Sequence, residues 1–263
     1  MMTWRRGRGA ARYRFALTVL VVLGAATKDL PAQAASPSCA VPAEVFEFEP
    51  YLPRTLAALE AGGPFTIVAL GGASTLGRAA GHADKTWPAR LGAILSARFP
   101  KAQITVVNRG VARETAVQMA ARIERDVLAL KPALVIWETG TNDAVRATDV
   151  DEFRDVLDAG IARLRVSVPE VMLMNPQFSR RSEFIVNFNR YIAILRGVAD
   201  IDEVPLFPRH EIMRDWADRG VFNFAVTGRE QRRDLAIEVY DCIAVAVTDM
   251  ITRRAPPLPV ATP

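Results

Sequence analysis

The sequence predicts an α/β protein in which helices cover both faces of a parallel sheet. Two observations lead to this fold class. Short apolar runs alternate along the chain with longer amphipathic stretches, which is the pattern of β-α-β units. Hydrophobic residues make up 50% of the 263 residues, so the chain can bury a substantial core. We find no internal repeat and expect one domain with five strands.

The strands are predicted from the apolar runs. The run at 66–70 is nearly continuously apolar and ends in Gly71 and Gly72, as a strand buried on both faces of a parallel sheet does. The two glycines permit a sharp turn and a close approach of other groups. Because ligands bind beyond the carboxyl ends of such strands, we expect the chemistry in the turn over 71–77. The other strands are predicted at 103–108, 133–137, 171–174 and 204–207.

The segments between the runs have helical patterns. In the stretch 87–99, Leu91, Leu95 and Phe99 share one stripe with Ile94, which is typical of an amphipathic helix. The remaining helices are predicted at 52–61, 114–130, 150–166, 183–199, 211–218 and 229–253. A helix on each crossover makes the sheet parallel and three-layered. We expect this domain to occupy residues 63–254.

The first 34 residues have the composition of a secretory signal peptide. Arginines between positions 5 and 14 precede an apolar stretch at 15–26, and Ala32-Gln33-Ala34 has the small residues of a cleavage site. We expect cleavage after Ala34 and a periplasmic or secreted protein. The alternative is an uncleaved leader that anchors the chain to a membrane. Residues 35–62 are predicted to be a linker and a short helix, and residues 255–263 a disordered tail.

The leader also accounts for the basic character of the chain. It holds six of the 33 basic residues and one of the 29 acidic residues, so the remaining chain carries a net charge of about −1. No excess of basic residues is left to form a nucleic-acid surface.

Two cysteines, Cys39 and Cys242, lie after the leader. An even pair in an exported protein predicts a disulfide, here between the start of the mature chain and its last helix. Closing a loop of about 200 residues would stabilise the fold by about 4–5 kcal/mol on the chain-entropy account. The alternative is two separate thiols. His82 and His210 have no Cys or His neighbour at ligand spacing, so we expect no metal site.

Three stretches resemble motifs of the SGNH, or GDSL-type, hydrolases, each directly after a predicted strand. The first block of that family is G-D-S-x-T-x-G, and residues 71–77 read GGASTLG. Its second block carries an oxyanion-hole glycine, which corresponds to Gly110. Its third block, G-x-N-D, is matched by residues 140–143. The resemblance covers about residues 65–250 and implies the three-layer α/β/α, flavodoxin-like fold of the family, with a five-stranded parallel sheet.

The departures from the family pattern concern the catalytic residues. In these hydrolases the serine of the first block attacks an ester carbonyl, and a histidine assisted by an aspartate three residues earlier takes its proton. Aligned on its glycines, this chain has Ala73 at the nucleophile position, and the segment 222–234, where the Asp-x-x-His pair should lie, contains no histidine. Nucleophile, base and orienting acid are missing together, whereas the oxyanion donors Gly110 and Asn142 remain.

Three other residues are candidates for a rebuilt catalytic site. Ser74 is either a displaced nucleophile or a serine that stabilises a turn or caps a helix. His210 is either a relocated base or a surface residue at a helix start, and His82 is predicted to contact a ligand near the mouth of the pocket.

Three residues are predicted ligand or oxyanion contacts: Gly72, Gly110 and Asn142. The alternative for Gly110 is a turn that needs a positive φ, and the alternative for Asn142 is an amide that bonds its own turn.

Two functional hypotheses follow. The preferred one is an exported SGNH-hydrolase-like protein that has lost ester hydrolysis and binds an acylated glycan, a lipid or an envelope protein partner. The second is an active esterase or acyltransferase that uses Ser74 with His210 or His82. Nucleotide binding is disfavoured because GGASTLG is not G-x-G-x-x-G, and we expect no cofactor. A membrane is expected to be a partner only through an uncleaved leader.

Overall fold

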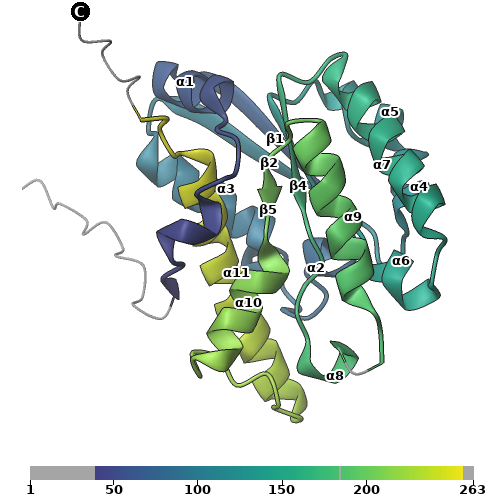
Figure 1. Cartoon of the computed structure of the whole chain (residues 1–263). Helices are drawn as coiled ribbons and strands as arrows, with labels where there is room; N and C mark the ends of the chain where they lie inside the picture. Colours follow the sequence, from purple (N-terminus) through teal and green to yellow (C-terminus); the bar gives the residue numbers. More distant parts are fainter. Residues whose placement is uncertain (1–38, 184, 257–263) are drawn as a thin grey trace, which may run out of the picture. The chain divides into compact units, whose positions relative to one another are not determined.

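Five parallel strands form a single sheet in the computed structural model of the protein, which describes residues 39–183 and 185–256 (Figure 1). The strands are β1 (Gly63–Gly71), β2 (Ala102–Gly110), β3 (Leu134–Glu138), β4 (Glu170–Met174) and β5 (Leu206–Phe207). Their order in the sheet is β2-β1-β3-β4-β5. This is the flavodoxin-like order that the resemblance implied, and the predicted fold class is confirmed.

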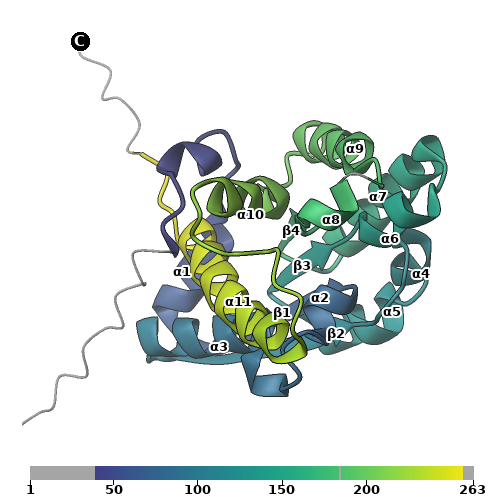
Figure 2. The same ribbon diagram turned by 90° about the horizontal axis from the view of Figure 1, so that it is seen from below.

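Helices cover both faces of this sheet (Figures 1 and 2). One face carries α1 (Pro53–Ala61), α3 (Trp87–Arg98), α10 (Arg209–Asp218) and α11 (Arg229–Ile251). The other carries α4 (Ala116–Ala120), α5 (Ile123–Asp126), α7 (Val150–Arg165) and α9 (Phe188–Ile201). The shorter elements are α2 (Ala73–Leu76), α6 (Thr141–Arg146), α8 (Arg180–Glu183) and the 3-10 turns η2 (Ala43–Phe46), η3 (Ala83–Lys85) and η4 (Leu128–Leu130).

The alternation of side chains along β1 divides the core in two. Ile67 and Ala69 pack with α3 and α11, whereas Val68 and Leu70 pack with α4, α7 and α9. All four side chains are fully buried. This explains why the run reads as continuously apolar, since both faces of the strand need apolar side chains.

The order of the strands locates the candidate site. The chain leaves β1 toward β2 on one side and returns to β3 on the other side of β1. At such a switch point the two crossovers diverge, and a crevice forms beyond the carboxyl ends of the strands. Here the crevice lies between the segments that follow β1 and β3.

Two predicted helices differ from the structure. The stretch 114–130 is not one helix but α4, α5 and η4, because the chain turns at 121–122, where the buried Arg122 makes contacts with other elements. The helix predicted at 183–199 begins instead at Phe188, because the side chain of Asn187 accepts a hydrogen bond from the backbone N–H of Arg190 and caps the helix there. The turn predicted at 71–77 contains the short helix α2.

The predicted disulfide is present between Cys39 and Cys242, whose Cα atoms are 5.0 Å apart. It joins the first described residue to the middle of α11. Among the described residues, no helix has the length and apolar character needed to cross a bilayer. The predicted signal peptide, and all but the first two residues of the predicted tail, lie outside the described residues.

Candidate functional site

Two opposite charges are buried where β3 and β5 end. Glu138 is the last residue of β3, and Arg209 follows β5 as the first residue of α10. Their side chains belong to residues that are 1% and 0% exposed. An isolated buried charge is strongly unfavourable, so each must find partners within the fold.

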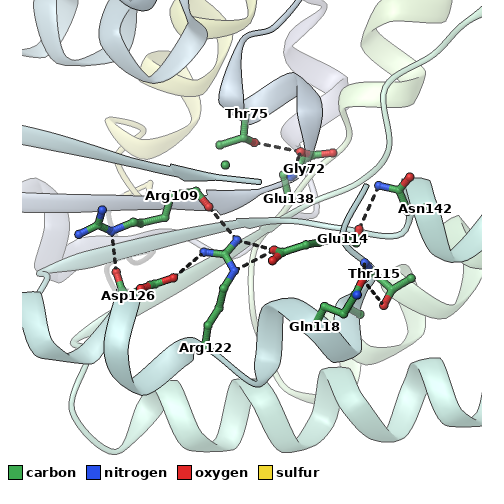
Figure 3. A network of polar contacts seen from close by, with 12 residues as sticks. Gly72, Thr75, Arg109, Glu114, Thr115, Gln118, Arg122, Asp126, Glu138 and Asn142 are labelled. Carbon is green, nitrogen blue, oxygen red and sulfur yellow. Dashed lines mark hydrogen bonds and ion pairs between the residues drawn. The ribbon is translucent and has the colours of Figure 1, made fainter. Parts of the chain in front are cut away.

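Glu138 is stabilised by hydrogen bonds from the turn after β1. Its Oε2 accepts from the backbone N–H of Gly72 at 3.0 Å and from the Thr75 hydroxyl at 2.9 Å (Figure 3). It also accepts from the Ser74 hydroxyl at 3.0 Å. Thr141 donates to its other oxygen at 3.4 Å. The carboxylate therefore holds the start of α2 against the end of β3.

Arg209 reaches the same turn from the end of β5, an edge strand of the sheet. Its Nη1 donates to the Ser74 Oγ at 2.8 Å, and its Nη2 donates to Gln177 Oε1 at 3.3 Å. Burial lowers the pKa of Arg209, and the negative charge of Glu138 opposes that shift. Ser74 thus bridges the two charges: its proton points to the carboxylate and its lone pair accepts from the guanidinium.

A cavity of about 100 Å³ opens beside this bridge. Ala73 and Asn142 line it, together with Ser74, Met119 and Gln177. The cavity is far smaller than the roughly 300–1,000 Å³ of a typical pocket for a drug-sized ligand. It can take a small group such as an acetyl, while the rest of a larger ligand stays outside. Ala73, at the expected nucleophile position, presents only a methyl group here.

The three predicted oxyanion donors are engaged within the protein. The N–H of Gly72 bonds to Glu138, and the N–H of Gly110 bonds to Asn108 Oδ1 at 2.9 Å. The Asn142 amide donates to the Glu114 carbonyl at 3.0 Å (Figure 3). Of the three, Gly72 and Asn142 line the cavity. Asn142 does not bond its own turn, and its amide has a second N–H.

Gly110 is explained by close packing. A Cβ at this position would lie 2.1 Å from the backbone nitrogen of Leu76. Its φ is outside the left-handed region, so the alternative of a turn with positive φ does not account for the glycine. The end of β2 and the backbone of α2 touch at this point.

Neither histidine lies beside Ser74. The His210 ring is buried against Phe178 and Phe188, and its Nε2 is 3.0 Å from a carboxylate oxygen of Glu183. Burial lowers the pKa of His210, and the nearby charges of Glu211 and Glu183 oppose that shift. His210 is therefore buried, and the alternative interpretation of a surface residue at a helix start is wrong.

His82 is exposed at the start of η3 and does not line the cavity. No hydrogen bond joins Ser74 to either imidazole within 39–183 and 185–256. The structure brings Ser74, Ala73, Gly72 and Asn142 together and leaves His82 and His210 elsewhere. In the same part of the chain, no cluster of three acidic, His or Cys side chains could hold a metal ion.

A polar network fastens the loops around the cavity. Asp143 accepts from the backbone N–H of Ala116 at 3.0 Å, and burial raises the pKa of this carboxyl. Arg122 donates to Glu114, to Asp126 and to the carbonyl of Arg109 (Figure 3). These contacts connect α4, α5 and the end of β2, and they hold the carbonyl of Glu114 that Asn142 bonds.

Glu138 and Arg209 were not predicted as site residues from the sequence. A signal was present, because each is a charged residue at the end of a short apolar strand, where a parallel sheet allows little solvent. Ser74 connects the two charges, but it lies 64 positions from Glu138 and 135 positions from Arg209 in the sequence. No local sequence pattern reveals contacts over such separations.

The chain is similar to known proteins over most of its length. A model of the non-GDSL lipase-like family matches residues 38–256. An acetylxylan esterase of Geobacillus stearothermophilus is 31% identical over 100 residues, which are 34% of this chain and 46% of that esterase. The chain thus aligns with less than half of this curated relative.

Solved structures share the fold. The crystal structure of Axe2, an acetylxylan esterase from Geobacillus stearothermophilus, covers 74% of this chain and 97% of its own, with a TM-score of 0.59 and 18% identity. A two-domain esterase active on acetylated mannans, co-crystallised with mannopentaose, matches 81% of this chain with 58% of its own, with a TM-score of 0.62 and 20% identity. At such identities the likeness shows the fold alone. Together with the family match, it confirms the predicted resemblance.

Proposed function

Because the chain belongs to the non-GDSL lipase-like family, we propose that it is an extracytoplasmic esterase-like protein that binds an acetylated glycan without hydrolysing it. The observation that carries the proposal is the hydrogen bonding and burial of Ser74. Its hydroxyl is bonded to Glu138 and Arg209 at once, and its residue is only 7% exposed. A nucleophile needs access to its substrate and a base that can take its proton.

The neighbouring position supports the same conclusion. Ala73 lines the cavity where the family pattern has its serine, and no imidazole is within hydrogen-bonding reach of residue 74. Loss of a catalytic triad leaves only residual rate enhancement from binding and oxyanion contacts. The scaffold would then serve to bind.

The ligand class rests on the cavity and on the relatives. Acetylxylan esterases and an esterase active on acetylated mannans share the fold. A cavity of about 100 Å³ with the Asn142 amide and the Met119 side chain on its wall suits an acetyl group. A lipid or an envelope protein is the alternative partner, and the binding test below distinguishes an acetylated glycan from a lipid.

The competing function is an active esterase that uses Ser74. It is favoured by the 3.0 Å contact between the Ser74 hydroxyl and a carboxylate, which could act as a base. It is disfavoured because the same carboxylate oxygen accepts two further hydrogen bonds, from Gly72 and Thr75.

Acetate release from acetylated xylan and from an aryl acetate tests the loss of hydrolysis. We expect no turnover above buffer from the purified protein, from Ser74→Ala or from Ala73→Ser, since a serine at residue 73 would still lack a base. Turnover by the unmodified protein that disappears in Ser74→Ala would overturn the proposal.

Thermal unfolding tests the ligand. Acetylated xylo-oligosaccharides should raise the Tm, whereas the same oligosaccharides after chemical deacetylation should not, because only the folded state binds. Ala73→Leu narrows the cavity and should abolish the shift, whereas Ala57→Leu at an exposed position on α1 should retain it. An equal response to the deacetylated sugar, or a response only to lipid, would contradict an acetyl-glycan site.

A further inference from the structure

A second cavity lies beyond Arg209, between α10, α11 and the segment after β4. Its volume is about 150 Å³, and it shares Gln177 with the first cavity. Its walls are largely apolar, formed by side chains such as Phe178, Met213 and Val239. Arg209 and Arg232 also line it, and the described lining contains no carboxylate.

Arg209 is incompletely satisfied in this setting. Its two hydrogen bonds go to the neutral oxygens of Ser74 and Gln177, and its buried Nε has no partner. No carboxylate forms an ion pair with it in the part of the chain that the structure describes, and Glu138 acts on it only across Ser74. A buried guanidinium with a free donor favours a nearby anion.

Tyr240 places a second donor at the same cavity. Its residue is 4% exposed, and within the described residues its hydroxyl makes no hydrogen bond. Burial raises the pKa of Tyr240, and the nearby Arg209 charge opposes the shift. The hydroxyl therefore keeps its proton near neutral pH and can donate.

Arg232 adds positive charge at the entrance. It is exposed on α11, lines the cavity and has no ion-pair partner in the described part of the chain. Its neighbour Arg233 forms an ion pair with Asp234 and does not line the cavity. The pair offers a matched comparison on the same helix.

We propose that this second cavity binds a small monocarboxylate with an apolar tail, the carboxylate accepting from the Tyr240 hydroxyl beside the positively charged Arg209 and the tail lying against Phe178, Met213 and Val239. The proposal does not rest on the proposed glycan site, because it needs neither Ala73 nor Asn142, although the two cavities share Gln177. Any short-chain or aromatic monocarboxylate has the required chemistry.

Calorimetric titration of the whole protein with sodium hexanoate tests the site, with hexanamide as the neutral isostere. We expect saturable binding of hexanoate and none of hexanamide. Tyr240→Phe should weaken binding by about tenfold, the usual effect of removing a hydrogen bond to a charged group. Arg232→Gln should weaken it by about two- to fivefold and reduce its salt dependence.

Two matched variants serve as controls. Arg233→Gln and Tyr51→Phe, the latter a residue that does not line the cavity, should bind hexanoate as the unmodified protein does. The proposal is overturned if no saturation is seen up to about 20 mM hexanoate, or if hexanamide binds equally well. It is also overturned if Tyr240→Phe and Arg232→Gln leave the affinity unchanged. Each variant's Tm confirms folding before titration.

Discussion

Ser74 connects a buried carboxylate with a buried guanidinium. Glu138 and Arg209 do not touch each other directly, and the hydroxyl between them at 3.0 and 2.8 Å lets each charge stabilise the other. A residue that reads in the sequence as a turn serine or a nucleophile therefore has a structural role. We interpret the Ser74 hydroxyl as a structural link between these two charges.

Glu138→Gln tests the importance of the buried charge. The amide has nearly the same shape but loses the charge that accepts from Gly72, Ser74 and Thr75 and that balances Arg209. Removing one partner of a buried charge pair costs about 3–5 kcal/mol, which urea unfolding would measure. The exposed Glu47→Gln should change stability by less than about 0.5 kcal/mol. Equal effects of the two changes would show that the buried charge is not stabilising.

At the scale of elements, α2 is held by contact with the end of β2. Gly110 lets the two backbones touch, and the Asn108 amide donates to the carbonyl of Thr75 at 2.6 Å. The helix is only four residues long, so tertiary contacts rather than its own hydrogen bonds must stabilise it. The orientation of Ala73 and Ser74 follows from this packing.

Gly110→Ala should displace α2. The added methyl would overlap the backbone of Leu76, where no flexible side chain can yield, so we expect a loss of about 2–3 kcal/mol or more in unfolding free energy. Gly197→Ala is the matched control, because a Cβ there meets nothing within 4 Å and the residue lies inside α9. That variant should gain about 0.5–1 kcal/mol. A loss of stability in both variants would point to a general cost of replacing glycine.

Arg122 shows why a helix predicted from the sequence is broken. The residue pattern over 114–130 is typical of a helix. The buried guanidinium of Arg122, however, donates hydrogen bonds to Glu114, to Asp126 and to the carbonyl of Arg109. The bonds to Glu114 and to the carbonyl of Arg109 are not helical contacts, and they outweigh the small preferences that favour continuation of the helix. Helical periodicity does not reveal these bonds, because the carbonyl of Arg109 lies on β2, 13 residues from Arg122.

The contacts of Asp126 with Arg125 and Arg122 should make the free energy of unfolding depend on pH in the acidic range. Hydrogen bonding to Arg125, and then to Arg122, lowers the pKa of Asp126 from 3.8 to about 2. A folded-state pKa below the unfolded one stabilises the fold above pH 3.8, and the contribution disappears as the pH falls toward 2. Such a shift corresponds to at most about 2–3 kcal/mol, which solvent screening reduces to about 1 kcal/mol.

Asp126→Asn should therefore be less stable than the unmodified protein at pH 7, and most of this difference should disappear by pH 2. Unfolding in urea across this range measures the difference. Asp200→Asn changes an exposed residue without an ion pair in the described chain and should show no such pH dependence. A difference for Asp126→Asn that is as large at pH 2 as at pH 7 would exclude the charge interaction as its cause.

At the scale of the whole molecule, the sequence predicted the elements better than the site. All five strands were found because each is a short apolar run with its own end signals, as Gly71 and Gly72 show for β1. The residues of the site come from the ends of different strands. Their pairing depends on the order of the strands, which the resemblance supplied and periodicity did not. Hence Ala73 and Asn142 were found through their motifs, whereas Arg209 was missed.

The disulfide should contribute strongly to global stability. Cys39 and Cys242 are separated by 203 residues, and a crosslink over this distance restricts the unfolded chain greatly. We expect Cys39→Ser/Cys242→Ser to lose about 4–5 kcal/mol in unfolding free energy. Adding reductant to the unmodified protein should reproduce the loss, while the double variant should not respond to it. An unchanged urea midpoint after reduction would contradict this expectation.

The same bond has a consequence for the order of events during biosynthesis. A chain made from its amino end presents Cys39 early, and its partner becomes available only once α11 has been synthesised. Until then Cys39 is a single thiol, open to mispairing with other proteins. A product that terminates before α11 keeps that thiol permanently, so bond closure distinguishes a finished polypeptide from a truncated one.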